Sequence, residues 1–189
     1  MFEKYVPTTI SSRGSLGEIW IDKETKLVKK IFKPNAISIK NRPTFHRKIE
    51  EITKLYNNEI YWTTKLKSKY LVETNEYGEL KNEEGFYLIQ EYAGPDLLHY
   101  ECKTANVFPN LIDQLDEMFK FFKENEVYKI NNAKCNLSMS SNGQLKCFDF
   151  KYAVPRTSKS TMLEMLSVTR WLSNIDESVE PRLSKHILI

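Results

Sequence analysis

The stretch from Asn131 to Lys151 places the strongest constraint on how this chain folds. Apolar and polar residues alternate on both sides of the dipeptide Asn142-Gly143, and an Asn-Gly pair between two such alternations is a strong β-hairpin signal. Asn136 stands just before the first expected strand and Asp149 just after the second. Because the two ends of a hairpin lie side by side, we expect it to bring an amide and a carboxylate together.

The bulk properties indicate an ordinary globular protein. A chain of 189 residues can form one full core or two small lobes, and a net charge of +3 is too small to predict specific nucleic-acid binding. No apolar run approaches the roughly 18 to 20 residues of a membrane span, and the N-terminus lacks the apolar segment of a signal peptide. Three cysteines without Cys-x-x-Cys spacing favour reduced thiols. We therefore expect a cytoplasmic protein with no membrane partner.

The first half of the chain combines strand and helix signals. Strand-like alternation covers Tyr5 to Lys33, and apolar positions three or four residues apart predict a helix over Phe45 to Lys67. Two more strands are expected over Tyr70 to Tyr77 and Phe86 to Tyr92, with a polar turn between them. Together these elements predict an α+β lobe with five strands.

The second half has a different character. A helical pattern covers Pro109 to Glu126, the hairpin follows, and a last helix fits Ser160 to Asn174. We therefore expect two domains, a strand-rich one over residues 1–93 and a reduced helical one over residues 94–189.

The end of the hairpin carries a resemblance to a known family. The segment Cys147-Phe148-Asp149-Phe150-Lys151 resembles the Asp-Phe-Gly motif of protein kinases, and Asn136 corresponds to the metal-binding asparagine of their catalytic loop. The resemblance implies that Asn136 and Asp149 hold Mg²⁺ against the phosphates of ATP. It also implies a kinase-like two-lobed fold, with a five-stranded antiparallel N-lobe and a truncated helical C-lobe.

Three earlier segments extend this resemblance. Ser12 to Ile19 resembles the Gly-rich loop with its first glycine replaced by serine, Leu27 to Phe32 resembles the strand that carries the phosphate-binding lysine, and Phe86 to Gly94 resembles the fifth strand and hinge. Lys30 is the expected phosphate lysine, with Lys29 as the alternative. The resemblance implies nucleotide contacts from Gly14, Gly17, Ile19, Val28, Lys30, Glu59, Gln90, Glu91 and Ala93.

The catalytic loop departs from the family pattern. The triplet His-Arg-Asp corresponds here to Lys129-Ile130-Asn131, so Asn131 replaces the aspartate that takes the proton of the substrate hydroxyl. An amide cannot accept that proton. The loop lysine of the family is displaced by one position, to Lys134, from which it would reach the γ-phosphate. The glycine of the Asp-Phe-Gly motif is replaced by Lys151, which adds a positive charge near the expected metal.

These features predict a kinase-like ATP-binding protein with impaired catalysis, a pseudokinase, that acts through a protein partner. One alternative is an active atypical kinase or another ATP-dependent transferase, which uses Mg²⁺ held by Asp149 and Asn136. The other alternative is an interaction module that binds no nucleotide, with exposed aromatic residues such as Trp171 making the contact. The lysine- and asparagine-rich composition is compatible with a viral or phage origin.

Overall fold

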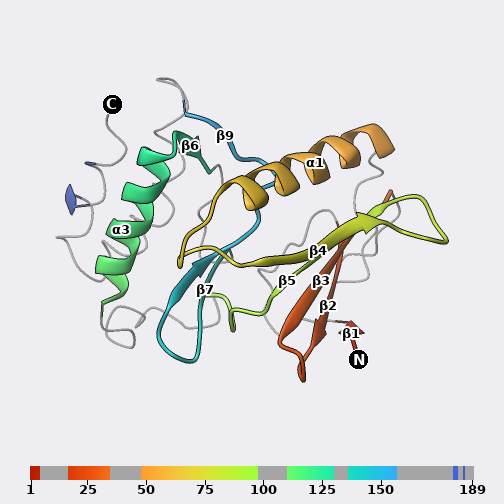
Figure 1. Ribbon diagram of the computed structural model, residues 1–189, viewed down its shortest axis with the longest axis horizontal. Helices are drawn as coiled ribbons and strands as arrows, with labels where there is room; N and C mark the ends of the chain where they lie inside the picture. Colours follow the sequence, from red (N-terminus) through yellow and green to blue (C-terminus); the bar gives the residue numbers. More distant parts are fainter. Residues whose placement is uncertain are drawn as a thin grey trace. The chain divides into compact units, whose positions relative to one another are not determined.

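The computed structural model shows a mixed α+β protein with a mostly antiparallel sheet (Figure 1). It describes residues 1–4, 17–34, 48–97, 110–129, 136–156, 181–182 and 185. The chain divides into two compact units: the first contains Met1–Lys65 and Val72–Ala93, and the second contains Leu66–Leu71 and Gly94–Ile189.

The first unit is built on an antiparallel sheet. Four six-residue strands form its body: β2 (Gly17–Asp22), β3 (Leu27–Phe32), β4 (Thr74–Glu79) and β5 (Phe86–Glu91). The two-residue strand β1 (Glu3–Lys4) pairs with β2, which gives the order β1-β2-β3-β5-β4. The expectation of five strands is therefore corrected to four full strands and a short edge segment, because only two residues pair with the outer edge of β2.

The turn between β2 and β3 is organised by Asp22. Its carboxylate accepts hydrogen bonds from the backbone N–H groups of Glu24 (3.0 Å) and Thr25 (3.3 Å), and Lys26 takes a left-handed conformation with φ 55°. Aspartate commonly starts such a turn because its side chain satisfies backbone donors two and three residues ahead. The turn sets the register that pairs Lys30 with Ile19.

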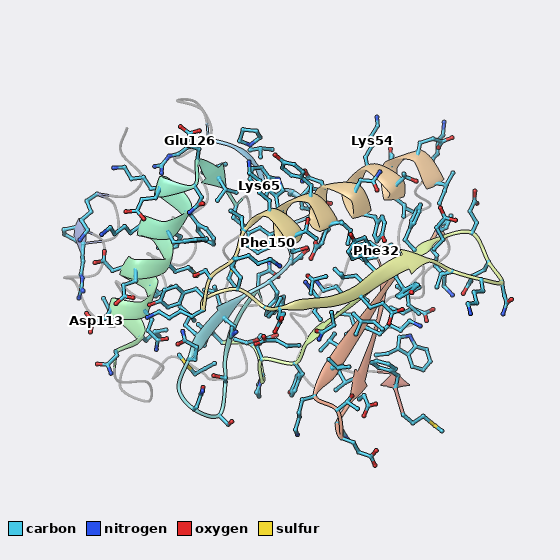
Figure 2. The ribbon with its side chains drawn as sticks, in the orientation of Figure 1. Phe32, Lys54, Lys65, Asp113, Glu126 and Phe150 are labelled. Carbon is cyan, nitrogen blue, oxygen red and sulfur yellow. The ribbon has the colours of Figure 1, made fainter. Side chains whose placement is uncertain are left out.

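Helix α1 (Ile49–Lys65) packs against the sheet of the first unit and begins with two acidic residues in its first turn. Phe32, which is labelled in Figure 2, joins Ile52, Tyr56 and Leu88 in a buried cluster. The Tyr56 ring also stacks on Phe86 at 4.4 Å between centroids. Apolar contacts of this kind hold the helix over one end of the sheet.

The start of β4 differs from the expected strand over Tyr70 to Tyr77. Tyr70 and Leu71 lie in the second unit. There the Tyr70 carbonyl accepts a hydrogen bond from the Cys147 N–H at 2.7 Å, and Leu71 forms an isolated parallel β-bridge with Cys147. Both side chains are buried. Because their backbone groups are paired there, β4 begins only at Thr74.

Helix α3 (Leu111–Glu124) is the main helix of the described second unit. One face of it is buried, and this face carries Leu111, Leu115, Met118, Phe119 and Phe122. A short antiparallel pair follows, made by β6 (Val127–Tyr128) and β9 (Val154–Pro155). Helix α3 thus lies within two residues, at each end, of the helix that the apolar spacing predicts over Pro109 to Glu126.

The hairpin predicted around Asn142-Gly143 consists of β7 (Leu137–Met139) and β8 (Leu145–Cys147). Gly143 has φ 79°, and its N–H donates to the Ser140 carbonyl at 2.9 Å. Glycine adopts this left-handed conformation without steric cost. The Gln114 side chain holds α3 against the hairpin through two hydrogen bonds. Its Oε1 accepts from the Leu145 N–H at 2.8 Å, and its Nε2 donates to the Gly143 carbonyl at 2.8 Å.

Within the ranges that the structure describes, neither helix is long and apolar enough to cross a bilayer. The helix predicted over Ser160 to Asn174, with Trp171, lies outside the described residues. The first residues of the helix predicted from Phe45 lie outside them as well.

Candidate functional site

In the first unit, the residues predicted to contact nucleotide gather on one face of the sheet. The register pairs Lys30 with Ile19 on one side and with Leu88 on the other, and it pairs Val28 with Gln90. Residues directly opposite each other in an antiparallel pair share a face, and residues two apart on a strand do so as well. Ile19, Val28, Lys30 and Gln90 therefore share one face of three neighbouring strands.

Lys30 forms an ion pair with Glu59 of α1. The Lys30 Nζ lies 3.0 Å from the Glu59 Oε1. The Glu59 side chain is 0% exposed, whereas that of Lys30 is 14% exposed. Lys29, the alternative phosphate lysine, instead lies with its Nζ 5.0 Å from the centre of the Tyr87 ring. Lys30 is thus the lysine of this strand that the helix glutamate contacts.

The Glu59 carboxylate is only half satisfied within the described part of the chain. Its Oε2 is buried and has no hydrogen-bond partner there. Glu59 belongs to the buried stripe of α1 with Ile52, Tyr56 and Trp62, where an apolar side chain is the common occupant. A buried ion pair of this kind is weak support for stability, because the desolvation of both charges offsets their attraction.

The other predicted nucleotide contacts of the first unit are placed as follows. Gln90 is buried, and its Nε2 lies 3.4 Å from the Thr74 hydroxyl. The Glu91 N–H donates to the Glu73 carbonyl at 2.9 Å, so the sheet already uses this donor. Ala93 is buried at the end of the unit. The predicted contacts of Glu91 and Ala93 with an adenine edge stay predictions.

The Gly-rich segment is described only at its end. Gly17 begins β2 and pairs with Phe32, whereas Gly14 lies outside the described residues. Ile19 is half-buried. The predicted role of this loop therefore stays a prediction.

In the second unit, the hairpin brings Asn136 and Asp149 to the same end. The Asn136 carbonyl accepts a hydrogen bond from the Phe148 N–H at 3.1 Å, and Asp149 is the next residue. The Asn136 side chain is buried, and Asp149 takes a left-handed conformation with φ 68°. Such a conformation is uncommon for a residue other than glycine and is enriched for Asp and Asn.

Asp149 is engaged by a cation of the chain itself. The Lys151 Nζ contacts both carboxylate oxygens of Asp149, and the two side chains are only 11% and 17% exposed. Both oxygens that would ligate a divalent cation are thus already in contact with a cation of the chain. As these side chains stand, Asn136 and Asp149 do not fit the predicted Mg²⁺.

Lys129 was not singled out by its sequence pattern as a buried residue. It is 1% exposed, and its Nζ lies 5.2 Å from the centre of the Phe150 ring. Phe150, labelled in Figure 2, is fully buried and also packs against Phe122. The segments that resemble the catalytic loop and the Asp-Phe-Gly motif thus meet at this ring. The apolar neighbours Val127 and Tyr128 were the available signal for burial.

The two residues predicted for the catalytic loop, Asn131 and Lys134, lie outside the described residues. Over the described ranges, no three His, Cys, Asp or Glu side chains gather in a group that could hold a metal ion. No protein-family model and no curated protein matches this chain. Membership of the kinase-like superfamily therefore stays a prediction.

Proposed function

We propose that this chain is a kinase-like ATP-binding protein with impaired phosphotransfer, which acts through a protein partner. The observation that carries the proposal is the ion pair between Lys30 of β3 and Glu59 of α1. A lysine on the third strand that pairs with a glutamate of the following helix is the arrangement with which kinases hold the α- and β-phosphates of ATP.

The burial of Glu59 favours a functional role for the pair over a purely structural one. Replacing a buried ion pair with well-packed apolar residues is often neutral or stabilising. Glu59 lies at 0% exposure in the apolar stripe of α1, and one of its oxygens has no hydrogen-bond partner among the residues that the structure describes. Stability alone therefore gives little reason for a charge there. The half-buried Ile19 and Val28 share the face of Lys30. They provide an apolar surface of the kind that a nucleotide base contacts.

The impaired phosphotransfer follows from the composition of the catalytic loop. Asn131 replaces the aspartate that takes the proton from the substrate hydroxyl, and its amide has no basic site for that proton. Phosphoryl transfer depends mainly on positioning and electrostatic stabilisation. Loss of the base therefore slows transfer without removing the residues that would hold the nucleotide.

Thermal unfolding with and without ATP tests the proposal. A ligand at 100 times its Kd stabilises a protein by ~2.7 kcal/mol, so a clear rise in Tm is expected for the wild type and for Lys29→Met. The rise should be absent in Lys30→Met. Because we expect this variant to be less stable than the wild type, each shift is measured against the same variant without ATP.

Two outcomes would contradict the proposal. No shift with ATP in the wild type would favour an interaction module that binds no nucleotide. Transfer of labelled γ-phosphate by the wild type, lost in Asp149→Asn, would instead identify an active transferase. In the same assay, a gain of transfer by Asn131→Asp would show that the missing base limits the reaction.

A further inference from the structure

The pairing of Asp149 with Lys151 is unusual for two residues at the end of a short strand. Charged side chains two positions apart commonly extend into solvent, and exposed ion pairs contribute little. Here the Lys151 ammonium contacts both oxygens of the Asp149 carboxylate, and both side chains are largely withdrawn from water. The left-handed backbone at Asp149 ends the strand alternation at this point.

We propose that Lys151 is a tethered cation that replaces a divalent metal ion at Asp149, so that this chain binds its nucleotide without metal. The part of this proposal that concerns nucleotide rests on the proposed function. The exclusion of metal rests on the hairpin geometry alone. One side chain, Lys151, decides whether the Asp149 carboxylate accepts a divalent cation.

The chemistry of the carboxylate supports this assignment. An ionised aspartate near a triphosphate repels it unless a positive charge intervenes, and kinases supply that charge with Mg²⁺. Mg²⁺ demands near-octahedral oxygen ligands and is usually bound through one or two carboxylates together with phosphates and water. In this chain the ammonium occupies both carboxylate oxygens, so the charge is neutralised with no metal.

The residues around the ion pair also support the assignment of Lys151 as the cation at Asp149. The Lys151 Nζ also lies 5.5 Å from the centre of the Tyr152 ring, a distance at which a ring face attracts a cation. Asn136, the other predicted ligand, is buried with its backbone tied to Phe148. An ammonium neutralises a carboxylate but does not bridge phosphate oxygens as a metal ion does, which agrees with a protein that holds nucleotide and transfers phosphate poorly.

Titration with Mn²⁺ alone, followed by the loss of the free-ion electron paramagnetic resonance signal, tests the exclusion of metal without any nucleotide. The wild type is expected to show no Mn²⁺ site that depends on Asp149. Lys151→Met should gain a site at least about tenfold tighter than any wild-type binding, and Lys151→Met/Asp149→Asn should lose it. Lys120→Met, which removes a solvent-exposed lysine of α3, is the control for general charge.

Two results of this titration would overturn the claim. One is a wild-type Mn²⁺ site that Asp149→Asn removes, and the other is a Lys151→Met variant that gains no site. Circular dichroism verifies that each variant is folded, and Lys151→Gln replaces Lys151→Met if the latter is not.

A second experiment tests nucleotide binding without metal, by comparing the rise in Tm that ATP causes in excess EDTA with the rise in excess MgCl₂. The wild type should show equal rises, whereas Lys151→Met should show a larger rise with MgCl₂. A wild-type rise that requires MgCl₂ would overturn the inference. The absence of any ATP effect in every variant would refute the proposed function instead, and the Mn²⁺ titration would still decide the role of Lys151.

Discussion

Breaking the Lys30–Glu59 pair from its two sides should have unequal effects on stability. Lys30→Met leaves the Glu59 carboxylate at 0% exposure, with neither oxygen paired to any residue in the described ranges, and an uncompensated buried charge costs about 3–5 kcal/mol. Glu59→Leu leaves Lys30, which is 14% exposed and carries its charge on a flexible stem. Because that ammonium can reach water, we expect a smaller loss of about 1–3 kcal/mol.

The double variant Lys30→Met/Glu59→Leu removes both charges together. It should lie within about 1 kcal/mol of the wild type or exceed it in stability. The cycle would then give a large coupling energy, since the sum of the single losses far exceeds that of the double. Lys29→Met, on the opposite face of the same strand, is the matched control. We expect it to change the stability by less than about 1 kcal/mol, because it removes a single cation–π contact with the Tyr87 ring from the described part of the chain.

Urea unfolding followed by far-ultraviolet circular dichroism measures these free energies. A loss below about 1 kcal/mol for Lys30→Met, or a double variant as unstable as that single one, would refute the reasoning that Glu59 is a desolvated charge. The double variant also separates stability from function. It should retain its fold and yet show no rise in Tm with ATP.

Three further predictions concern the fold. Burial raises the pKa of the Tyr56 hydroxyl to about 12, so between pH ~10 and ~12 the unfolded chain loses a proton that the folded chain keeps. Between about pH 9 and about pH 11.5, urea unfolding should show the stability falling by up to about 1.8 kcal/mol more in the wild type than in Tyr56→Phe, and an equal fall in the two proteins would contradict this. Gly94→Ala should lose about 1–3 kcal/mol in the same assay, because its φ is 96° and a Cβ would lie 2.5 Å from the Met139 carbonyl oxygen; an unchanged midpoint would show that the backbone relaxes freely. Leu115→Ala, at a position with 0% exposure, should lose about 2–5 kcal/mol, and a loss near zero would mean that the buried face of α3 is loosely packed.

Local pattern was sufficient for several elements. The alternation around Asn142-Gly143 predicted the hairpin of β7 and β8, and the apolar spacing predicted α3 to within two residues at each end. The period of two along β3 also separates Lys29 from Lys30 by face. These features depend on residues within a few positions of one another, where backbone geometry alone relates sequence to direction.

Other features depended on contacts between distant segments. Residues 70–71 were predicted to start a strand of the first sheet, and they instead pair with Cys147 in the second unit. The sequence predicted the partner of Lys30 only through a family resemblance, because the pair joins residues 29 positions apart. The burial of Lys129 over Phe150 was not predicted, because lysine is rarely found inside a protein and the sequence alone therefore places it at the surface.

The sequence by itself determined which residues occupy each face of a strand or helix, because backbone periodicity relates near neighbours directly. The tertiary structure decided which charges meet. Lys151 was recognisable only as an added positive charge near Asp149. The structure shows that it contacts both carboxylate oxygens, next to a left-handed backbone at Asp149 and with both side chains largely withdrawn from water. Such pairings depend on side-chain direction and burial, which periodicity does not specify.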